Sequence, residues 1–147
     1  MTKILIVVSD LHKKISNILL NSAISSLEEH NIGYEKIIVP GTFELASAIN
    51  MGLETFDYNG VIVLGCVVYE QTTHCDIITR ECARAVQDIS IYYSIPLGFG
   101  LLLVGNLDDA FSKAAIYGKN AANSCVKMMK IKEQFMMYNE RKYSKFN

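Results

Sequence analysis

Short apolar runs occur at four places in the chain, at residues 4–8, 37–39, 61–68 and 97–104. None of them alternates apolar with polar residues, which is typical of strands covered on both faces, as in a parallel sheet. The segments between them carry apolar residues at helical spacing. One stripe comprises Ile15, Ile18, Leu19, Ser22, Ala23 and Leu27, and a later one Ile77, Ile78, Cys82, Ala85, Val86 and Ile89. Strands and helices therefore alternate from the start of the chain.

This alternation predicts an α/β fold with a four-stranded parallel sheet between layers of helices, joined by right-handed crossovers. In such sheets the ligand binds beyond the carboxyl ends of the strands. The informative segments are therefore those that follow the strands, at residues 9–12, 40–44, 66–74 and 98–106.

The last third of the chain is expected to hold two helices. Asp108 and Asp109 suit the positive N-terminal end of a short helix. Gly118 is the expected stop before a final helix. The polar tail at residues 139–147 is expected to fray.

Composition narrows the class of protein. A chain of 147 residues, 50% apolar and 20% charged, fits one domain spanning residues 1–147. A net charge of −1, with no basic stretch beyond Lys13-Lys14, argues against nucleic acid as a partner. No apolar run is long enough to cross a bilayer, and the opening MTKILIVV is too short for a signal peptide, so we expect a cytoplasmic protein without a membrane partner.

Cofactor and metal signatures are missing from the sequence. The cysteines form no C-x-x-C pair and are expected to be reduced core residues, and the histidines share no ligand spacing, so no metal is expected. The phosphate loops G-x-G-x-x-G and G-x-x-x-x-G-K-[ST] and the nucleophile elbow G-x-S-x-G are absent. The candidate chemistry is acid–base catalysis on a phosphorylated substrate, without a cofactor.

The connection after the second apolar run is the first candidate binding segment. Pro40 and Gly41 make a turn in which Thr42 can cap the next helix and leave backbone N–H groups free for a ligand. The alternative is an ordinary capped connection, in which Phe43 and Glu44 only pack and cap.

The segment after the third run is the second candidate. Thr72 and Thr73 offer hydroxyl and N–H groups for a phosphate where a helix should start. His74 follows them, and imidazole exchanges protons near neutral pH. The alternative is that His74 is a structural residue at the start of the helix.

Three segments resemble those of lumazine synthases, in the order and spacing of that family. Residues 39–49 read VPGTFELASAI, residues 64–85 read LGCVVYEQTTHCDIITRECARA, and residues 95–114 read IPLGFGLLLVGNLDDAFSKA. The resemblance implies a flavodoxin-like three-layer sandwich. It also implies an enzyme that condenses 5-amino-6-(D-ribitylamino)uracil with 3,4-dihydroxy-2-butanone 4-phosphate to 6,7-dimethyl-8-ribityllumazine, releasing phosphate and water, in riboflavin synthesis.

The resemblance assigns a role to each matching residue. His74 would transfer protons, and Phe99 of an adjacent subunit would help enclose the pyrimidine. The phosphate would be held by Gln71, Thr72 and Lys113. The pyrimidine and its ribityl chain would be held by Leu11, Thr42, Phe43, Glu44, Cys66, Val67 and Val68.

The family resemblance also implies a ring of five subunits with active sites between neighbours, and riboflavin synthase as a pathway partner. A mean hydropathy of +0.20 and the methionines at 128, 129, 136 and 137 fit an assembly, although these methionines could instead pack the last helix onto its own sheet. Family members that form shells usually carry a longer N-terminal segment, and only three residues precede the first apolar run. We therefore expect an isolated ring rather than a larger shell.

Several positions depart from the family pattern. Leu11 replaces an aromatic residue that stacks on the pyrimidine, and Lys113 replaces an arginine that binds phosphate. Tyr69-Glu70 replaces a basic residue and a glycine, and Lys119 is only an approximate match to a second phosphate-binding lysine. These departures keep open a weakened paralogue that binds a flavin or lumazine.

A hypothesis that ignores the family is a flavodoxin-like regulatory or electron-transfer domain. A response regulator needs clustered acidic residues after the first strand and an aspartate after the third, but only Asp10 follows the first strand and no aspartate follows the third. A flavodoxin needs a hydroxyl-rich loop after the first strand, and Leu11-His12-Lys13 is not one.

Overall fold

The computed structural model describes residues 1–69 and 73–145. Strands and helices alternate along the chain, as the apolar pattern predicts. The elements are β1 (Lys3–Ser9), α1 (Lys13–Glu29), β2 (Gly33–Val39), the short 3-10 helix η1 (Thr42–Glu44), α2 (Leu45–Thr55), β3 (Gly60–Val68), α3 (Thr73–Tyr93), β4 (Leu97–Val104) and α4 (Leu107–Ser144).

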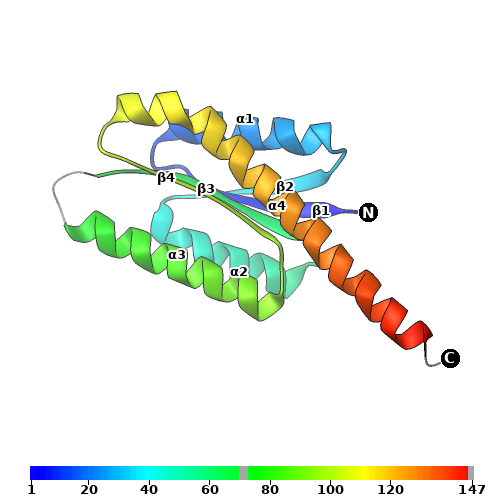
Figure 1. Cartoon of the computed structure of the whole chain (residues 1–147). Coiled ribbons are helices and arrows are strands. Elements are labelled where there is room, and N and C mark those ends of the chain that lie inside the picture. Colours follow the sequence, from blue (N-terminus) through cyan, green and yellow to red (C-terminus); the bar gives the residue numbers. More distant parts are fainter. Residues whose placement is uncertain (70–72, 146–147) are drawn as a thin grey trace.

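The four strands form one parallel sheet in the order β2-β1-β3-β4. Helices α1 and α4 cover one face and α2 and α3 cover the other (Figure 1). The predicted flavodoxin-like three-layer α/β sandwich is therefore confirmed. The strand order reverses between β1 and β3, which is where such sheets open a crevice for a ligand at their carboxyl edge.

The two central strands are covered on both faces, but the edge strand β2 is not. In β1, every residue from Ile4 to Ser9 is buried. Strand β2 begins at Gly33, before the apolar run that marked it, and Ile37 and Ile38 are exposed. The expectation of two covered faces is wrong for β2, because the helices pack over the central strands and leave these side chains of the edge strand uncovered.

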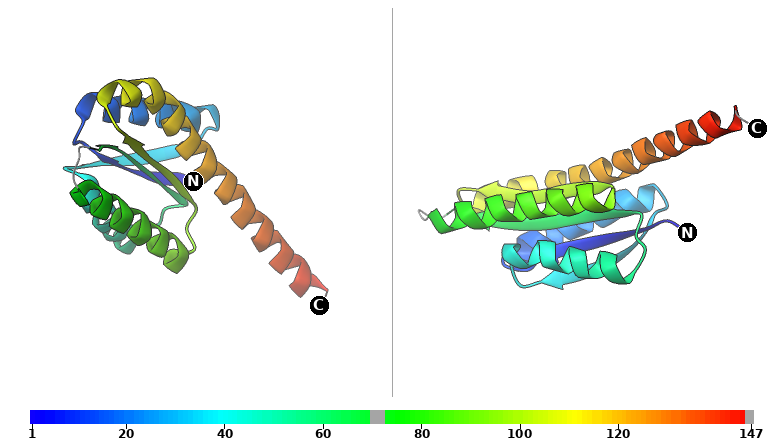
Figure 2. Two further views of the ribbon diagram at one scale, coloured as in Figure 1. Left: turned by 60° about the vertical axis from the view of Figure 1, so that its left-hand side comes forward. Right: turned by 90° about the horizontal axis from the view of Figure 1, so that it is seen from below.

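Helix α4 is a single helix of 38 residues, so the predicted stop at Gly118 is wrong. Gly118 is buried, and a Cβ there would lie 2.3 Å from the carbonyl oxygen of Leu19 in α1. The glycine therefore permits close packing of α4 on α1 and does not end the helix. The expected fraying from residue 139 is also wrong, because α4 continues to Ser144 and projects from the body (Figure 2).

The four cysteines form no disulfide, as expected, and three of them belong to the core, namely Cys66, Cys82 and Cys125. Burial raises the pKa of the Cys66 and Cys82 thiols to about 11 and that of Cys125 to about 12. These three thiols therefore stay protonated at neutral pH. Within residues 1–69 and 73–145, no helix combines the length and apolarity that a membrane span requires.

Candidate active site

The strand pairing leaves one edge of β3 open at the carboxyl end of the sheet. The β1–β3 ladder stops at the pair Val8–Leu64, whereas the β3–β4 ladder continues to Val68–Val104. Beyond β1, the Asp10 N–H donates to the carbonyl oxygen of Val39 at 2.8 Å, so the chain turns toward β2. Residues 66–68 consequently have a strand on one side only, and their other side has no strand partner.

The side chains of this end of β3 are mostly committed to the two cores. Cys66 and Val68 belong to the core on the α1/α4 face, and Val67 belongs to the core on the α2/α3 face. Cys66 is fully buried. These residues therefore leave main chain, rather than side chains, along the unpaired edge of β3.

Three residues after β2 form η1 and stand at the same edge of the sheet. The predicted capping role of Thr42 is wrong: Gly41 occupies the position before η1, Glu44 occupies the position before α2, and neither makes a side-chain capping bond. Thr42 is buried, whereas Phe43 is 68% exposed and Glu44 is also exposed. The turn thus buries a hydroxyl and presents an aromatic ring and a carboxylate outward.

His74 lies in the first turn of α3 and is exposed. The Sγ of Cys75 is 4.0 Å from the carbonyl oxygen of Val68, which keeps this turn beside the end of β3. Helix α3 also packs on η1. His74, η1 and the open edge of β3 therefore meet at one end of the sheet, while the predicted phosphate ligands Gln71 and Thr72 lie outside the described residues.

Leu11 stands in the loop between β1 and α1, and its side chain is exposed. The start of α1 is fixed next to it, because the Ser16 hydroxyl donates to the carbonyl oxygen of Ser9 at 2.5 Å. The aliphatic side chain is thus held at the carboxyl edge of the sheet.

Phe99 and Lys113 are not brought to His74 within one chain. Phe99 pairs with Val63, five residues before Val68, which at about 3.3 Å per residue places it about 16 Å from the carboxyl edge. Its ring is 40% exposed on the edge strand β4. Lys113 is exposed on α4, which covers the face opposite to α3.

Three buried hydroxyls, of Ser9, Thr42 and Thr79, have no hydrogen-bond partner among the described residues. Ser9 ends β1, and its Oγ lies close to Gly65, where an added Cβ would be 2.7 Å away. Our sequence reasoning gave no role to Ser9 or Thr79. The available signal was a serine that closes an apolar strand and a threonine on the buried stripe of α3.

The fold and this edge define an α/β protein that holds a small ligand at the switch point of a parallel sheet. The sequence pattern of the 6,7-dimethyl-8-ribityllumazine synthase family matches residues 1–133. A 6,7-dimethyl-8-ribityllumazine synthase of Bartonella tribocorum is 33% identical over 137 residues, covering 90% of this chain and 91% of that protein. One of Agrobacterium fabrum is 33% identical over 140 residues, covering 89% and 95%. The chain therefore belongs to the 6,7-dimethyl-8-ribityllumazine synthase family and is a transferase of riboflavin biosynthesis.

Proposed function

We propose that this chain condenses 5-amino-6-(D-ribitylamino)uracil with 3,4-dihydroxy-2-butanone 4-phosphate to give 6,7-dimethyl-8-ribityllumazine. The observation that carries the proposal is that η1, the open edge of β3 and His74 meet at the carboxyl end of the sheet, where sheets of this kind open a crevice for a ligand. Both substrates would lie in that crevice, which supplies the proximity that a condensation needs.

The crevice offers groups for each part of the pyrimidine substrate. Its ring and ribityl chain would lie along the main chain of residues 66–68, between that edge and η1. Phe43 would contact the ring and Glu44 would accept hydrogen bonds from ribityl hydroxyls, since both side chains are exposed there. Thr42 would contribute its backbone N–H.

The reaction would proceed through proton transfers at one end of the crevice. The 5-amino group attacks the ketone and forms a Schiff base with loss of water. Elimination then breaks the C–O bond to phosphate, and the ribitylamino nitrogen closes the second ring with loss of another water. His74 would accept and return protons in these steps, because it is exposed beside β3 and free to meet substrate.

The phosphate would sit at the start of α3, where backbone N–H groups point outward. Gln71 and Thr72 remain our proposed ligands for it, together with Lys113 of a neighbouring subunit, because Lys113 of the same chain lies on the opposite face of the sheet. A lysine keeps the positive charge of the family's arginine but makes no bidentate contact.

The active unit would be a ring of five in which one subunit completes the site of the next. The exposed ring of Phe99 on β4 supports this arrangement, since it lies too far from the edge to serve its own chain. At the carboxyl edge, a small hollow of about 220 Å³ lies between the starts of α1 and α4. A neighbouring subunit would therefore enclose the substrates.

The test is turnover by the purified chain with both substrates, followed by the fluorescence of the lumazine product. Addition of a riboflavin synthase, the proposed pathway partner, should convert that product to riboflavin. Tight binding of the lumazine product without turnover would favour a binding module, which is the function that Leu11 in place of an aromatic residue would allow.

A further inference from the structure

Three buried hydroxyls near the carboxyl end of the sheet are not used by the proposed reaction. Ser9, Thr42 and Thr79 are 0%, 5% and 8% exposed, and the hydroxyl oxygen of each has no hydrogen-bond partner among the residues that the structure describes. Buried polar groups are almost always paired in folded proteins, because a hydroxyl that leaves water without a new partner destabilises the fold. We call these three residues the hydroxyl cluster.

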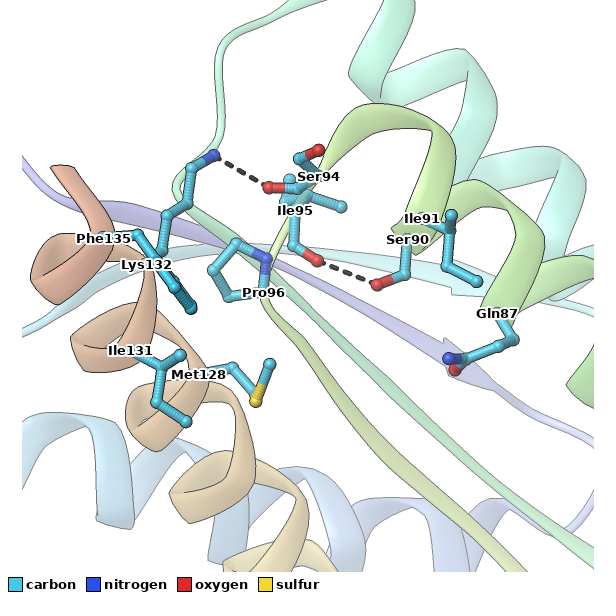
Figure 3. A pocket seen from close by; sticks show the side chains of 10 residues that line it. All are labelled: Gln87, Ser90, Ile91, Ser94, Ile95, Pro96, Met128, Ile131, Lys132 and Phe135. Carbon is cyan, nitrogen blue, oxygen red and sulfur yellow. Dashed lines mark hydrogen bonds between the residues drawn. The ribbon is translucent and has the colours of Figure 1, made fainter. Parts of the chain in front are cut away.

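Other hydroxyls of the chain that are buried or half-buried do have partners. The Ser26 hydroxyl donates to the Asn123 Oδ1 at 2.7 Å. Ser90 lines a groove of about 460 Å³ between the end of α3 and α4, and its hydroxyl donates to the Ile95 carbonyl oxygen at 2.9 Å (Figure 3). The missing partners are therefore a feature of the hydroxyl cluster.

The Ser9 hydroxyl points into the core between the sheet and α3. In β1, Leu5 and Val7 belong to the core on the α2/α3 face, and side chains alternate along a strand, so Ser9 points to the same face. A Cβ at Gly65 would lie 2.7 Å from the Ser9 Oγ and 3.1 Å from the Leu101 side chain of that core. The hydroxyl thus lies in the space that a side chain at position 65 would need.

Thr79 reaches the same level of this core from the helix. It lies on the buried stripe of α3 between Cys75 and Cys82, one turn or about 6 Å past Cys75. The Cys75 Sγ is 4.0 Å from the Val68 carbonyl oxygen, and α3 runs back along β3 (Figure 1). Two strand residues also span about 6–7 Å, so Thr79 stands level with residues 65–66. A threonine inside a helix can bond the carbonyl oxygen four residues earlier, but the Thr79 hydroxyl does not.

Thr42 adds η1 to this arrangement. It is the buried residue of η1, whereas Phe43 and Glu44 are exposed, so its side chain lies on the inner face of that turn. Helix α3 and strand β3, which carry Thr79 and Gly65, both pack on η1. The hydroxyl cluster therefore lies where the end of β1, η1 and α3 meet, on the core side of the groups proposed to hold the pyrimidine.

We propose that the hydroxyl cluster binds one buried water molecule and that Thr79 is a positioning residue of the active site. A buried water typically makes about three hydrogen bonds to polar groups that would otherwise be unpaired, and the cluster offers a hydroxyl from each of three elements. Through this water, Thr79 holds η1 against α3. It thereby fixes Phe43 and Glu44 on one side of the crevice relative to His74 on the other.

A crystal structure of the full chain, at a resolution that shows ordered water, tests the water itself and does not depend on the reaction. We expect one water about 2.8 Å from the hydroxyl oxygens of Ser9, Thr42 and Thr79. It should be absent from Thr79→Val, which keeps the shape of the side chain and removes only the hydroxyl. Hydroxyls that pair with main-chain groups and share no water would overturn the proposal.

The positioning role rests on the proposed function and is tested by turnover. Thr79→Val should raise the KM of the pyrimidine substrate by about fivefold, the usual effect of one lost hydrogen bond, because η1 would hold that substrate. Both kcat and the KM of the butanone phosphate should stay nearly constant. Thr79→Ser keeps the hydroxyl and should restore the wild-type KM. Ser26→Ala is the matched control, because it removes a buried hydroxyl between α1 and α4 and should lower Tm without changing either KM.

The double variant Thr42→Val, Thr79→Val tests whether the two hydroxyls act through one water. Its KM for the pyrimidine should equal that of Thr79→Val, because either change removes the same water. Effects that add, or wild-type KM values for Thr79→Val in a chain that turns over, would overturn the positioning role. A wild-type chain that makes no lumazine would instead contradict the proposed function, and the crystal structure would then decide whether the water is present.

Discussion

Phe99 lies opposite Val63 in the β3–β4 ladder, five residues before the Val68–Val104 pair that closes it. The ring is therefore about 16 Å from the carboxyl edge at which His74 stands. Strand β4 is also an edge of the sheet, and Phe99 is 40% exposed on it. A role for Phe99 in catalysis consequently requires a second subunit.

This relationship predicts complementation between two inactive variants. His74→Ala and Phe99→Asp should each lose most activity, and rings assembled from a mixture should regain part of it, because some interfaces then join a native His74 to a native Phe99. The measurement is lumazine fluorescence after the variants are co-refolded. Activity of the mixture equal to the sum of the separate variants would show that the two residues do not share a site.

His74→Ala should lower kcat by about 10- to 1,000-fold while the KM of both substrates stays nearly constant. The reason is that the imidazole would move protons during the reaction without holding either substrate in the ground state. His30→Ala, at the exposed C-terminal cap of α1, is the control and should leave both constants unchanged. Full kcat for His74→Ala between pH 6 and pH 8 would exclude the residue from the mechanism.

Lys113→Ala should raise the KM for the butanone phosphate by about 10-fold or more, which is what loss of one charge-assisted hydrogen bond costs. The KM for the pyrimidine should not change. Lys113→Arg should preserve or improve phosphate binding through the planar fork. Lys127→Ala is the control, because Lys127 is an exposed lysine further along α4. If Lys113→Ala raised the KM of both substrates equally, the assignment of Lys113 to the phosphate would be contradicted.

The sequence predicted the central strands well because burial on both faces leaves an unbroken apolar run. The same signal failed for β2, in which Tyr34, Glu35 and Lys36 interrupt the apolar pattern of an edge strand. It also failed at Gly118. A glycine there suggests the end of a helix, but its small size instead lets α1 pack closely against α4. The burial of β2 and the role of Gly118 depend on contacts between segments that are distant in the sequence. The local pattern of residues carries no information about those contacts.

For the candidate site, the sequence indicated which loops follow the strands but not what each side chain does there. Thr42 was expected to cap a helix and instead turns its hydroxyl inward. The positions of Phe99 and Lys113 relative to His74 depend on the register of β4 and on the face that α4 covers. Neither follows from the order of residues in one segment.

Gly118→Ala should destabilise the fold, although alanine normally stabilises a helix interior by about 1 kcal/mol relative to glycine. The added methyl group would lie 2.3 Å from the Leu19 carbonyl oxygen, so α1 and α4 must separate. We expect a loss of about 1–3 kcal/mol in the free energy of unfolding, measured by urea titration. Gly105→Ala is the matched control, because no atom lies within 4 Å of the added carbon. If Gly105→Ala lowered the free energy of unfolding as much as Gly118→Ala, the close-packing explanation would be contradicted.

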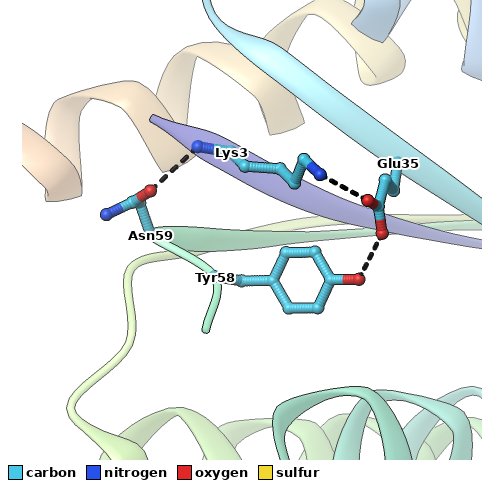
Figure 4. A network of polar contacts seen from close by, with 4 residues as sticks. All are labelled: Lys3, Glu35, Tyr58 and Asn59. Atoms are coloured by element: carbon cyan, nitrogen blue, oxygen red, sulfur yellow. Dashed lines mark hydrogen bonds and ion pairs between the residues drawn. The ribbon is translucent and has the colours of Figure 1, made fainter. Parts of the chain in front are cut away.

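At the amino end of the sheet, Glu35 joins β2 to two other segments (Figure 4). Its carboxylate accepts from the Lys3 Nζ at 2.5 Å and from the Tyr58 hydroxyl at 2.6 Å. These two bonds lower the pKa of Glu35 below its usual value. Partial burial, and then the bond to Glu35, raise the pKa of Tyr58 to about 12.

The lowered pKa gives Glu35 a pH-dependent role in stability. A carboxyl group whose pKa is lower in the folded state stabilises the fold above its unfolded pKa of about 4.3, and this contribution is lost as the pH falls through the lower folded value. Glu35→Gln should therefore have a lower Tm than the wild type at pH 7, and the difference should shrink as the pH falls below about 4. Because the Glu35 carboxylate is exposed, added salt should also reduce the difference in Tm.

The control is Glu140→Gln, because Glu140 is an exposed glutamate on the projecting end of α4. This variant should leave Tm unchanged across the same pH range. A Tm difference for Glu35→Gln that stays constant into acid would mean that the variant acts through packing and not through the charge of the carboxylate.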